Sequence, residues 1–212
     1  MTSELLPLFP LPSVVLFPGV FLPLHIFESR YREMVADALE TDRLIGMVLL
    51  QEQADDADGG APPIFAVGCT GLITHCEPLD DGRYNIILRG IDRFRVVRED
   101  HERAYRRAVI ETLPEPALTS DDRTRLSAYR SRVEALLAPA PDAGGLIPRA
   151  ASAMNDDDLI NVLSQYPGFD PVEKQALLET TGVMARAAAL AELLEMKLLF
   201  TRAAGESPAV VH

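Results

Sequence analysis

Two cysteines and two of the four histidines are of the residue types that could together form a zinc site. They are Cys69 and Cys76, with His75 and His25 as further nitrogen donors. Thiolates and imidazoles are the usual ligands of zinc. The two cysteines are not spaced as in a zinc knuckle, and along a strand they fall on opposite faces unless a bulge intervenes. We therefore predict two small, partly buried thiols and no metal site.

Residues for nucleophilic or acid–base catalysis do not form a recognisable motif. A nucleophile needs a nearby base and a third orienting group, and the histidines stand in no such pattern. The only lysines are Lys174 and Lys197, and neither follows a glycine, so the sequence has no phosphate-binding loop. Paired acids such as Asp80-Asp81 fit a turn, and Asp156-Asp157-Asp158 fits a helix start. The sequence predicts no catalytic residue, no cofactor and no small-molecule substrate.

The charge of the chain is strongly acidic, with 32 Asp and Glu against 20 Lys and Arg and a net charge of −12. Nucleic acids and anionic membranes attract the opposite sign. The one basic concentration, residues 89–107, holds Arg93 and Arg95 beside Phe94, and arginines with an aromatic platform are typical of single-strand RNA binding. Acids such as Asp92 interleave with these arginines, which favours a solvated, salt-bridged face. RNA binding through Arg93, Arg95 and Phe94 is the alternative hypothesis.

The start of the chain combines aromatic residues with prolines. Leu5 to Ile26 is apolar but is interrupted by five prolines, which cannot donate to a β-ladder, so short or edge strands are expected. An unpaired edge accepts an extended peptide by strand addition. Most of the aromatic side chains should be core, but this segment also carries the candidate peptide-binding residues, which are Phe9, Phe17, Phe21 and Phe27.

The pattern of apolar residues changes near Pro114-Glu115-Pro116. Before it, one helix is expected at 27–39. About six strands are expected in the opening segment and at 44–50, 64–76, 84–88, 91–97 and 105–113. After it, helical periodicity predicts about four helices, among them 120–137, with Ser120 as the cap, and 184–204. The fold class is therefore α+β, with a β domain at 1–116 and a helical bundle at 117–212. Gln51 to Pro63 is expected to be an exposed loop.

Targeting signals are not evident in the sequence. No apolar run reaches the roughly eighteen residues that a membrane span needs, and the N-terminus lacks a basic region. With only two cysteines, a reducing cytoplasm is the expected compartment.

Several ordered blocks resemble the N-terminal domain of the Lon protease family. The opening Leu6-Pro7-Leu8-Phe9-Pro10-Leu11 is similar to that family's start, and Pro23 to Tyr31 is similar to its free-standing bacterial members. Val67 to Ile73, followed by Leu79 to Arg83, resembles the central hairpin, and Ile87 to Phe94 the strand after it. The helical half, from Asp158-Leu159 to Glu179, resembles the segment that closes the domain. The resemblance covers roughly residues 4–200.

The resemblance implies a PUA-like β pseudo-barrel with one inserted helix, followed by a helical bundle. In complete Lon proteases this domain helps to capture protein substrates, whereas ATPase and protease modules follow it. This sequence ends at His212 without a phosphate loop or the module that carries the serine–lysine dyad, so a free-standing, non-enzymatic module is expected. Its implied partner is a protein or peptide client rather than a membrane or, unless the RNA alternative holds, a nucleic acid.

Overall fold

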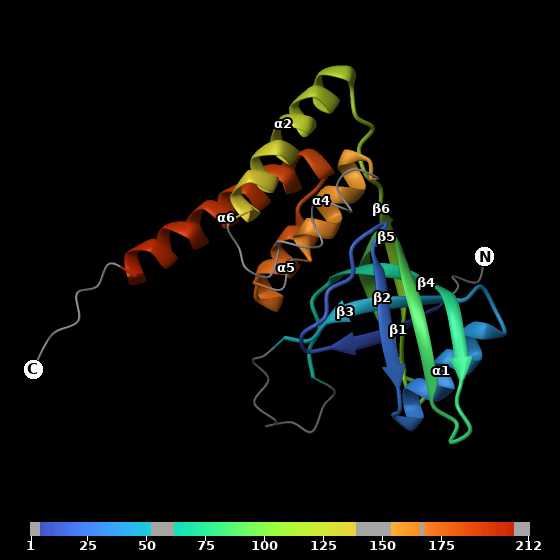
Figure 1. The fold of residues 1–212 in the computed structure, drawn as a ribbon. Coiled ribbons are helices and arrows are strands. Elements are labelled where there is room, and N and C mark those ends of the chain that lie inside the picture. The colour runs from blue at the N-terminus through green and yellow to red at the C-terminus, as the bar shows by residue number, and fades with distance from the viewer. Residues whose placement is uncertain (1–4, 52–61, 139–153, 166–167, 206–212) are drawn as a thin grey trace, which may run out of the picture. The chain divides into compact units, whose positions relative to one another are not determined.

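The computed structural model describes residues 5–51, 62–138, 154–165 and 168–205, and the side chains of those up to 200. They form a mixed α+β fold with a six-stranded sheet and five helices (Figure 1). The chain divides into two compact units. Unit 1 comprises Met1–Pro114 and Asn161–Glu179, and unit 2 comprises Glu115–Ile160 and Thr180–His212.

The sheet of unit 1 has the strand order β2-β5-β4-β3-β1-β6. Its strands are β1 (Leu6–Leu11), β2 (Phe21–Ile26), β3 (Leu44–Leu49), β4 (Val67–Pro78), β5 (Tyr84–Asp100) and β6 (Arg106–Leu113). Because β5 also pairs with β6, the strands β5, β4, β3, β1 and β6 close into a ring, and β2 extends it alongside β5. Within the described sheet, β2 is the strand with a neighbour on only one side.

The core of the ring comes from alternate residues of its strands, since every second side chain of a strand points to the same face. Leu6, Leu8, Val48, Phe94 and Ala108 form one buried cluster. The aromatic side chain of Phe94 fits only because glycines stand at two neighbouring positions. A Cβ at position 46 or 68 would lie 2.9 or 2.7 Å from its Cζ atom, so glycine is required at both positions.

The longest strand, β5, differs from expectation. Two strands, 84–88 and 91–97, were expected, but one strand runs unbroken for 17 residues. Gly90 stays in the strand because the backbone of another segment passes directly over it. Its amide donates to the Val20 carbonyl and its carbonyl accepts from Gly19, both at 2.9 Å, and a Cβ there would lie 2.0 Å from the Phe17 carbonyl oxygen.

Helix α1 (Ser29–Leu39) confirms the helix expected within the β half. Its apolar face, Tyr31, Met34, Val35 and Ala38, is buried, as the spacing predicts. The helix packs on β1, where the rings of Tyr31 and Phe9 lie 4.4 Å apart.

Helix α5 (Pro171–Glu179) belongs with the strands rather than with a separate helical bundle. The buried Arg93 donates to the Leu178 carbonyl at 2.9 Å, and the buried Gln175 donates to the Val67 carbonyl at 3.0 Å. These bonds join side chains and backbone far apart in sequence. The division at residue 116 therefore differs from the observed units, because residues 161–179 return to the β unit.

Unit 2 is built on α2 (Ser120–Leu137), which packs along α6 (Val183–Gly205). The expected bounds of α2 are confirmed, but its cap is Thr119 rather than Ser120. Thr119 and Asp122 form a reciprocal capping box. The fully buried Arg186 pairs with Glu115 at 2.7 Å. Helix α4 (Asp156–Ser164) begins in unit 2 and ends in unit 1.

The described helices include none whose length and apolarity suffice to cross a membrane. Most of the expected loop from Gln51 to Pro63 lies outside the described residues.

Candidate functional site

The edge strand β2 exposes a row of side chains on one face. Phe21, Pro23 and His25 are exposed and alternate with half-buried leucines, and Phe27 continues the alternation just after the strand. Phe21 and Phe27 are 59% and 62% exposed, which is unusual for large aromatic side chains. The rings of His25 and Phe27 stack with their centroids 6.3 Å apart. The row thus offers two aromatic side chains beside a strand that has a free edge.

The other two candidate phenylalanines lie elsewhere. Phe9 is buried against Tyr31, and Phe17 is fully buried. Both are core residues, so the structure does not bring the four phenylalanines together on one surface. Phe9 lies on β1, which pairs with β3 on one side and β6 on the other, and Phe17 lies in the segment that passes over Gly90 of β5.

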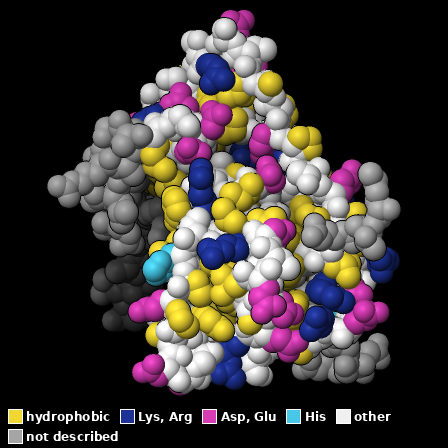
Figure 2. Space-filling view, turned by 90° about the vertical axis from the view of Figure 1, so that its right-hand side faces the viewer, with side chains coloured by type: hydrophobic (Ala, Val, Ile, Leu, Met, Phe, Trp, Pro, Cys, Tyr) yellow, Lys and Arg dark blue, Asp and Glu magenta, His cyan; other side chains and the backbone are white. Residues whose placement is uncertain are grey.

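The three residues of the RNA hypothesis do not form a surface platform. Phe94 fills the core, and Arg93, 2% exposed, holds the Leu178 carbonyl. Arg95 is exposed and lies 3.9 Å from Glu111. On the face in Figure 2, basic side chains lie among acidic ones instead of forming a continuous stripe. Side chains alternate along β5, so Phe94 points into the core while Arg93 and Arg95 share the opposite face, where Arg93 is buried against the Leu178 carbonyl of α5 and Arg95 stays exposed.

The candidate zinc ligands, Cys69, Cys76, His75 and His25, do not come together in the described part of the chain. Within it, no three His, Cys, Asp or Glu residues form a group able to hold a metal ion. Cys69 is buried and Cys76 is half-buried, and neither forms a disulfide bond. His25 instead contacts Asn85, with 2.8 Å between its Nδ1 and the Asn85 Oδ1.

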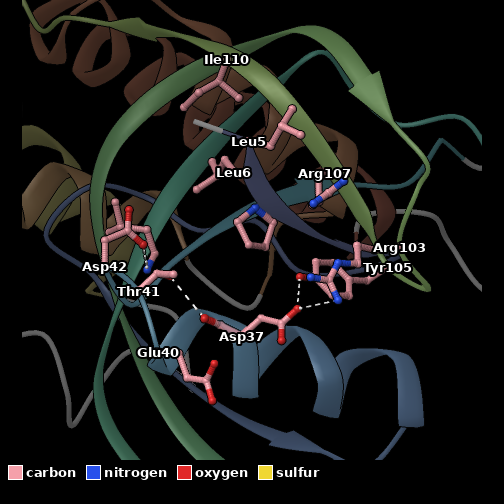
Figure 3. A pocket seen from close by; sticks show the side chains of 12 residues that line it. Leu5, Leu6, Asp37, Glu40, Thr41, Asp42, Arg103, Tyr105, Arg107 and Ile110 are labelled. Atoms are coloured by element: carbon pink, nitrogen blue, oxygen red, sulfur yellow. Dashed lines mark hydrogen bonds and ion pairs between the residues drawn. The ribbon is translucent and has the colours of Figure 1, made fainter. Parts of the chain in front are cut away.

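A cavity of about 430 Å³ opens beside the end of α1 in unit 1 (Figure 3). One wall is apolar and the opposite wall carries three carboxylates. The residues that line it are Leu5, Leu6, Pro7, Leu44 and Ile110 on the apolar side, Asp37, Glu40, Thr41 and Asp42 at the helix end, and Arg103, Tyr105 and Arg107. Its volume lies within the range of about 300–1,000 Å³ that is typical of ligand sites.

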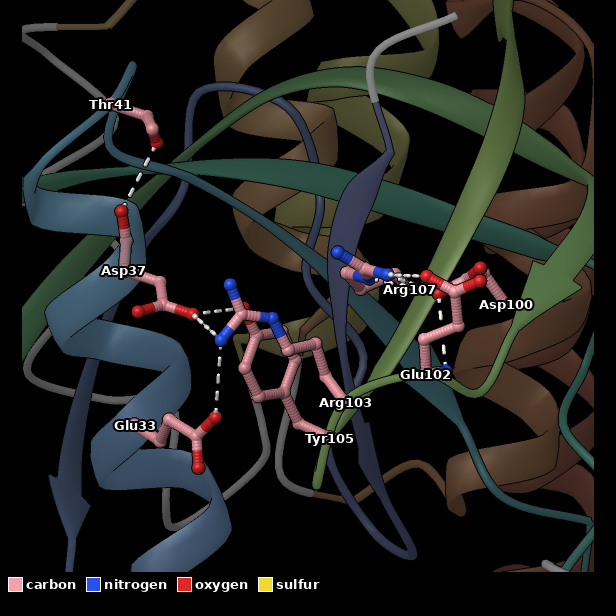
Figure 4. Close-up of polar contacts among 8 residues, drawn as sticks. All are labelled: Glu33, Asp37, Thr41, Asp100, Glu102, Arg103, Tyr105 and Arg107. Carbon is pink, nitrogen blue, oxygen red and sulfur yellow. Dashed lines mark hydrogen bonds and ion pairs between the residues drawn. The ribbon is translucent and has the colours of Figure 1, made fainter.

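Tyr105 fixes one corner of this cavity to the helix (Figure 4). Its buried hydroxyl donates to the Asp37 carboxylate at 2.6 Å. Burial, and then this bond to Asp37, raises the pKa of Tyr105 to about 12. Arg103 lies 3.7 Å from the same carboxylate and 3.6 Å from Glu33. The turn before β6 is thereby joined to α1 by a neutral hydroxyl and a shared cation.

The second arginine of the cavity is also paired with acids. The Arg107 Nε donates to the Asp100 carboxylate at 2.9 Å, and its Nη2 lies 3.5 Å from Glu102 (Figure 4). This bond holds the pKa of Asp100 below its ordinary value. Both arginines therefore have carboxylate partners of their own, so neither one neutralises Glu40 or Asp42.

Comparison with known proteins gives the family. Residues 5–196 match the model of the ATP-dependent protease La (LON) substrate-binding domain. The chain belongs to this family. Lon protease 2 of Myxococcus xanthus is 28% identical over 199 residues, which are 92% of this chain and 24% of that protein. Lon protease of Anaeromyxobacter dehalogenans is 26% identical over 197 residues, 91% of this chain and 23% of that protein. The chain spans about a quarter of the length of these relatives.

Two solved structures of Lon N-terminal domains share the fold of this chain. The N-terminal domain of the Mycobacterium avium complex Lon protease superposes with a TM-score of 0.68 at 17% identity, and covers 91% of this chain and 98% of its own. The Lon N-terminal domain protein from Xanthomonas campestris gives a TM-score of 0.60 at 22% identity, with 93% and 98% covered. At these identities the likeness establishes the fold alone.

Within this Lon substrate-binding domain, the cavity was not foreseen from the sequence. Asp37 and Tyr105 stand 68 positions apart, and neither belongs to a motif. One sequence signal was available. The last turn of α1 contains no basic residue, although cations are favoured at helix C-termini. An acidic helix end of this kind is a local conflict that a search for sites can use.

Proposed function

We propose that this chain is a non-enzymatic protein-binding module that captures exposed apolar segments of client proteins. The observation that carries the proposal is the family match over residues 5–196, which covers a substrate-binding domain and neither an ATPase nor a protease module. The activity of the complete Lon proteases is not transferred, because the matched region is about a quarter of each relative.

The proposal includes a finer description of the fold. We infer that the closed ring of β5, β4, β3, β1 and β6 is a PUA-like pseudo-barrel with α1 inserted between β2 and β3. The pairing of β5 with both β4 and β6 supports the closure. Closure leaves β2 as the described strand with a free edge, which makes it the place where a further strand would be added.

The β2 row supplies the contact surface in this proposal. An extended client segment would pair with the backbone of β2 and place alternate apolar side chains against Phe21 and Phe27. Pro23 has no amide hydrogen, so pairing is interrupted at the middle of the strand and long segments gain little extra affinity. Ordering a flexible client offsets much of the apolar gain, and micromolar dissociation constants are expected.

The proposed surface is tested with the double variant Phe21→Ser/Phe27→Ser. Reduced, carboxymethylated lactalbumin, labelled with a fluorophore, is titrated with the protein, and single-stranded oligouridylate is titrated in parallel. The variant is expected to weaken client binding about tenfold, since each aromatic contact contributes roughly 0.5–1.5 kcal/mol. Val97→Ser is the matched control, because Val97 is 62% exposed on β5 outside the row.

Salt separates the two classes of partner. Apolar contacts survive moderate salt, whereas RNA binding weakens steeply as counterions compete for phosphates. Client binding that weakens only modestly between low and high salt supports the proposal. RNA binding with a steep salt dependence and no client binding would replace it with the RNA hypothesis. Equal loss in the Val97→Ser control would remove the β2 row from the proposal.

A further inference from the structure

The C-terminal end of α1 concentrates negative charge where the helix itself is already negative. The aligned peptide dipoles place about half a negative charge at a helix C-terminus, and cations are the favoured neighbours there. The last turn of α1 contains no basic residue, and three acidic residues, Asp37, Glu40 and Asp42, lie in it or just after it. All three carboxylates line the cavity of about 430 Å³.

The positive charges around the cavity do not compensate this end of the helix. Arg107 is held by Asp100 and Glu102, and Arg103 is shared by Glu33 and Asp37. Three carboxylates line the cavity, and three more, those of Glu33, Asp100 and Glu102, pair with its arginines from outside. These six carboxylates outnumber the two guanidinium groups. The cavity therefore has an excess of negative charge.

Glu40 and Asp42 are the carboxylates that remain available. Glu40 forms no ion pair within the described part of the chain, and it is exposed at the mouth of the cavity. In Figure 3 its side chain extends from the helix end, below the apolar wall. One oxygen of Asp42 accepts the Leu44 amide at 3.0 Å, and its second oxygen has no described donor.

The opposite wall is apolar and only partly buried. Leu5, Pro7, Leu44 and Ile110 are half-buried, and beneath them Leu6 belongs to the core of the ring. A ligand that matches both walls must carry a positive charge next to an apolar group. A bare metal ion would match only the acidic wall, and the described carboxylates do not converge into a metal-binding group.

We propose that this cavity binds a protein segment in which a lysine or arginine adjoins a large apolar residue. This proposal rests on the proposed protein-binding function and specifies the chemistry of one client element. The basic side chain pairs with Glu40 and Asp42 at the helix end, and the apolar neighbour lies against Leu44 and Ile110. The cavity is a second contact, separate from the residues of the β2 row.

Tyr105 and Arg103 are positioning residues in this site. They hold the carboxylate of Asp37 at the inner corner, so it does not turn toward the ligand. Glu40 and Asp42 then make the direct contacts. The site selects against acidic segments because a carboxylate placed there would face the helix end and three like charges.

The test uses the full chain and three labelled ten-residue peptides of leucine, glycine and one variable residue. The variable residue is arginine in the first peptide, glutamine in the second and glutamate in the third. Binding is followed by fluorescence anisotropy at low and high salt, and the contacted residues are located by amide chemical-shift mapping. The arginine peptide is expected to bind about tenfold more tightly than the glutamine peptide at low salt, and the glutamate peptide more weakly still.

The decisive variant is Glu40→Gln/Asp42→Asn, which removes two charges while the asparagine oxygen still accepts the Leu44 amide. It is expected to weaken arginine-peptide binding about five- to tenfold and to leave the glutamine peptide unchanged. The matched control is Asp80→Asn/Asp92→Asn, which removes the same charge from exposed positions of unit 1 outside the cavity. An effect of equal size in the control would show that only net charge acts, and would overturn the proposal.

Four further outcomes also decide between these possibilities. Binding of carboxymethylated client without any preference for the arginine peptide refutes this site and leaves the proposed function intact, whereas failure of every protein ligand refutes both. Chemical shifts centred on the β2 row instead of the end of α1 overturn the cavity assignment. A magnesium titration that reproduces the arginine-peptide shifts would replace the peptide with a divalent cation and overturn the proposal.

Discussion

Removing one hydroxyl group tests the corner that joins α1 to β6. In the variant Tyr105→Phe the ring remains, and the bond of 2.6 Å to Asp37 is lost. A hydrogen bond to a charged group stabilises a protein by about 1.5–3 kcal/mol. Asp37 is about one-third exposed and keeps Arg103 at 3.7 Å, so its carboxylate is not left without a partner. The loss should therefore fall near the lower limit, about 1.5 kcal/mol.

Urea unfolding followed by circular dichroism measures this loss. With a slope near 2 kcal/mol per molar urea, the midpoint of the transition should fall by about 0.7 M. A double-mutant cycle with Asp37→Asn isolates the bond from other effects of each change, and a coupling free energy of about 1 kcal/mol is expected. Because Tyr105 and Asp37 lie in unit 1, a transition that belongs to unit 2 should not move.

The same bond predicts a dependence on alkaline pH. The pKa of Tyr105 is about 12 in the folded chain, above the ordinary value of 10. A raised pKa means that the stabilisation is complete below pH 10 and is lost as the pH rises through 12. The free energy of unfolding should therefore fall more between pH 10 and 12 in the parent chain than in Tyr105→Phe. The sequence has five tyrosines and no tryptophan, so the ionisation of Tyr105 is measured as the difference in tyrosinate absorbance between the parent chain and Tyr105→Phe.

Two results would refute this account of the corner. A coupling free energy below about 0.3 kcal/mol would show that the hydroxyl and the carboxylate do not interact in solution, since independent sites add to within that range. Equal alkaline losses of stability in the parent and in Tyr105→Phe would show that other groups dominate. Either result would also remove Tyr105 as a positioning residue of the cavity.

The remaining predictions concern packing in each unit. Gly90→Ala should destabilise unit 1 by about 3 kcal/mol, because the new Cβ meets a backbone carbonyl at 2.0 Å, whereas Gly71→Ala should cost less, since its nearest contacts are side-chain carbons at 3.0–3.3 Å. Equal melting temperatures for the two variants would contradict this. Leu194→Ala should cost roughly 2–5 kcal/mol in unit 2, where Leu194 is 4% exposed. Leu199→Ala, at 64% exposure, should stay within about 0.5 kcal/mol in the same urea titration, and a larger loss would indicate that this part of α6 is covered.

The sequence predicted helices correctly where apolar residues keep the helical spacing over several turns, and it predicted a hairpin from its turn residues. The buried face of α1 follows from the spacing of Tyr31, Met34, Val35 and Ala38, and α2 begins and ends at the expected residues. The hairpin at Asp80 to Arg83 is also present, with Gly82 at a φ of 78°. In each case a short segment contains the information needed, either as periodicity or as turn chemistry.

Patterns failed where a residue's environment is supplied by a distant segment. Separate strands were expected at 84–88 and 91–97, but the backbone of residues 17–20 covers Gly90, and one strand continues through it. Arg93 suggested a surface charge, but α5 provides a carbonyl for it in the interior. The cavity depends on a contact between positions 37 and 105, which no local window contains.

The return of residues 161–179 to the β unit has a consequence for how this domain is built. The chain passes between the two units at three places, near residues 114, 160 and 179. Gln165 donates to the Val15 carbonyl at 2.7 Å, and Gln175 and Arg93 also form side-chain hydrogen bonds between this segment and the strand region. A fragment that ends at residue 116 would lose the Leu178 acceptor of a buried guanidinium and the apolar cover of α5. Removing α5 would expose to water the apolar surface that this helix covers, which costs about 25 cal/mol per Å². The β half is therefore not complete by itself, and a binding site on its strands depends on helices that come much later in the sequence.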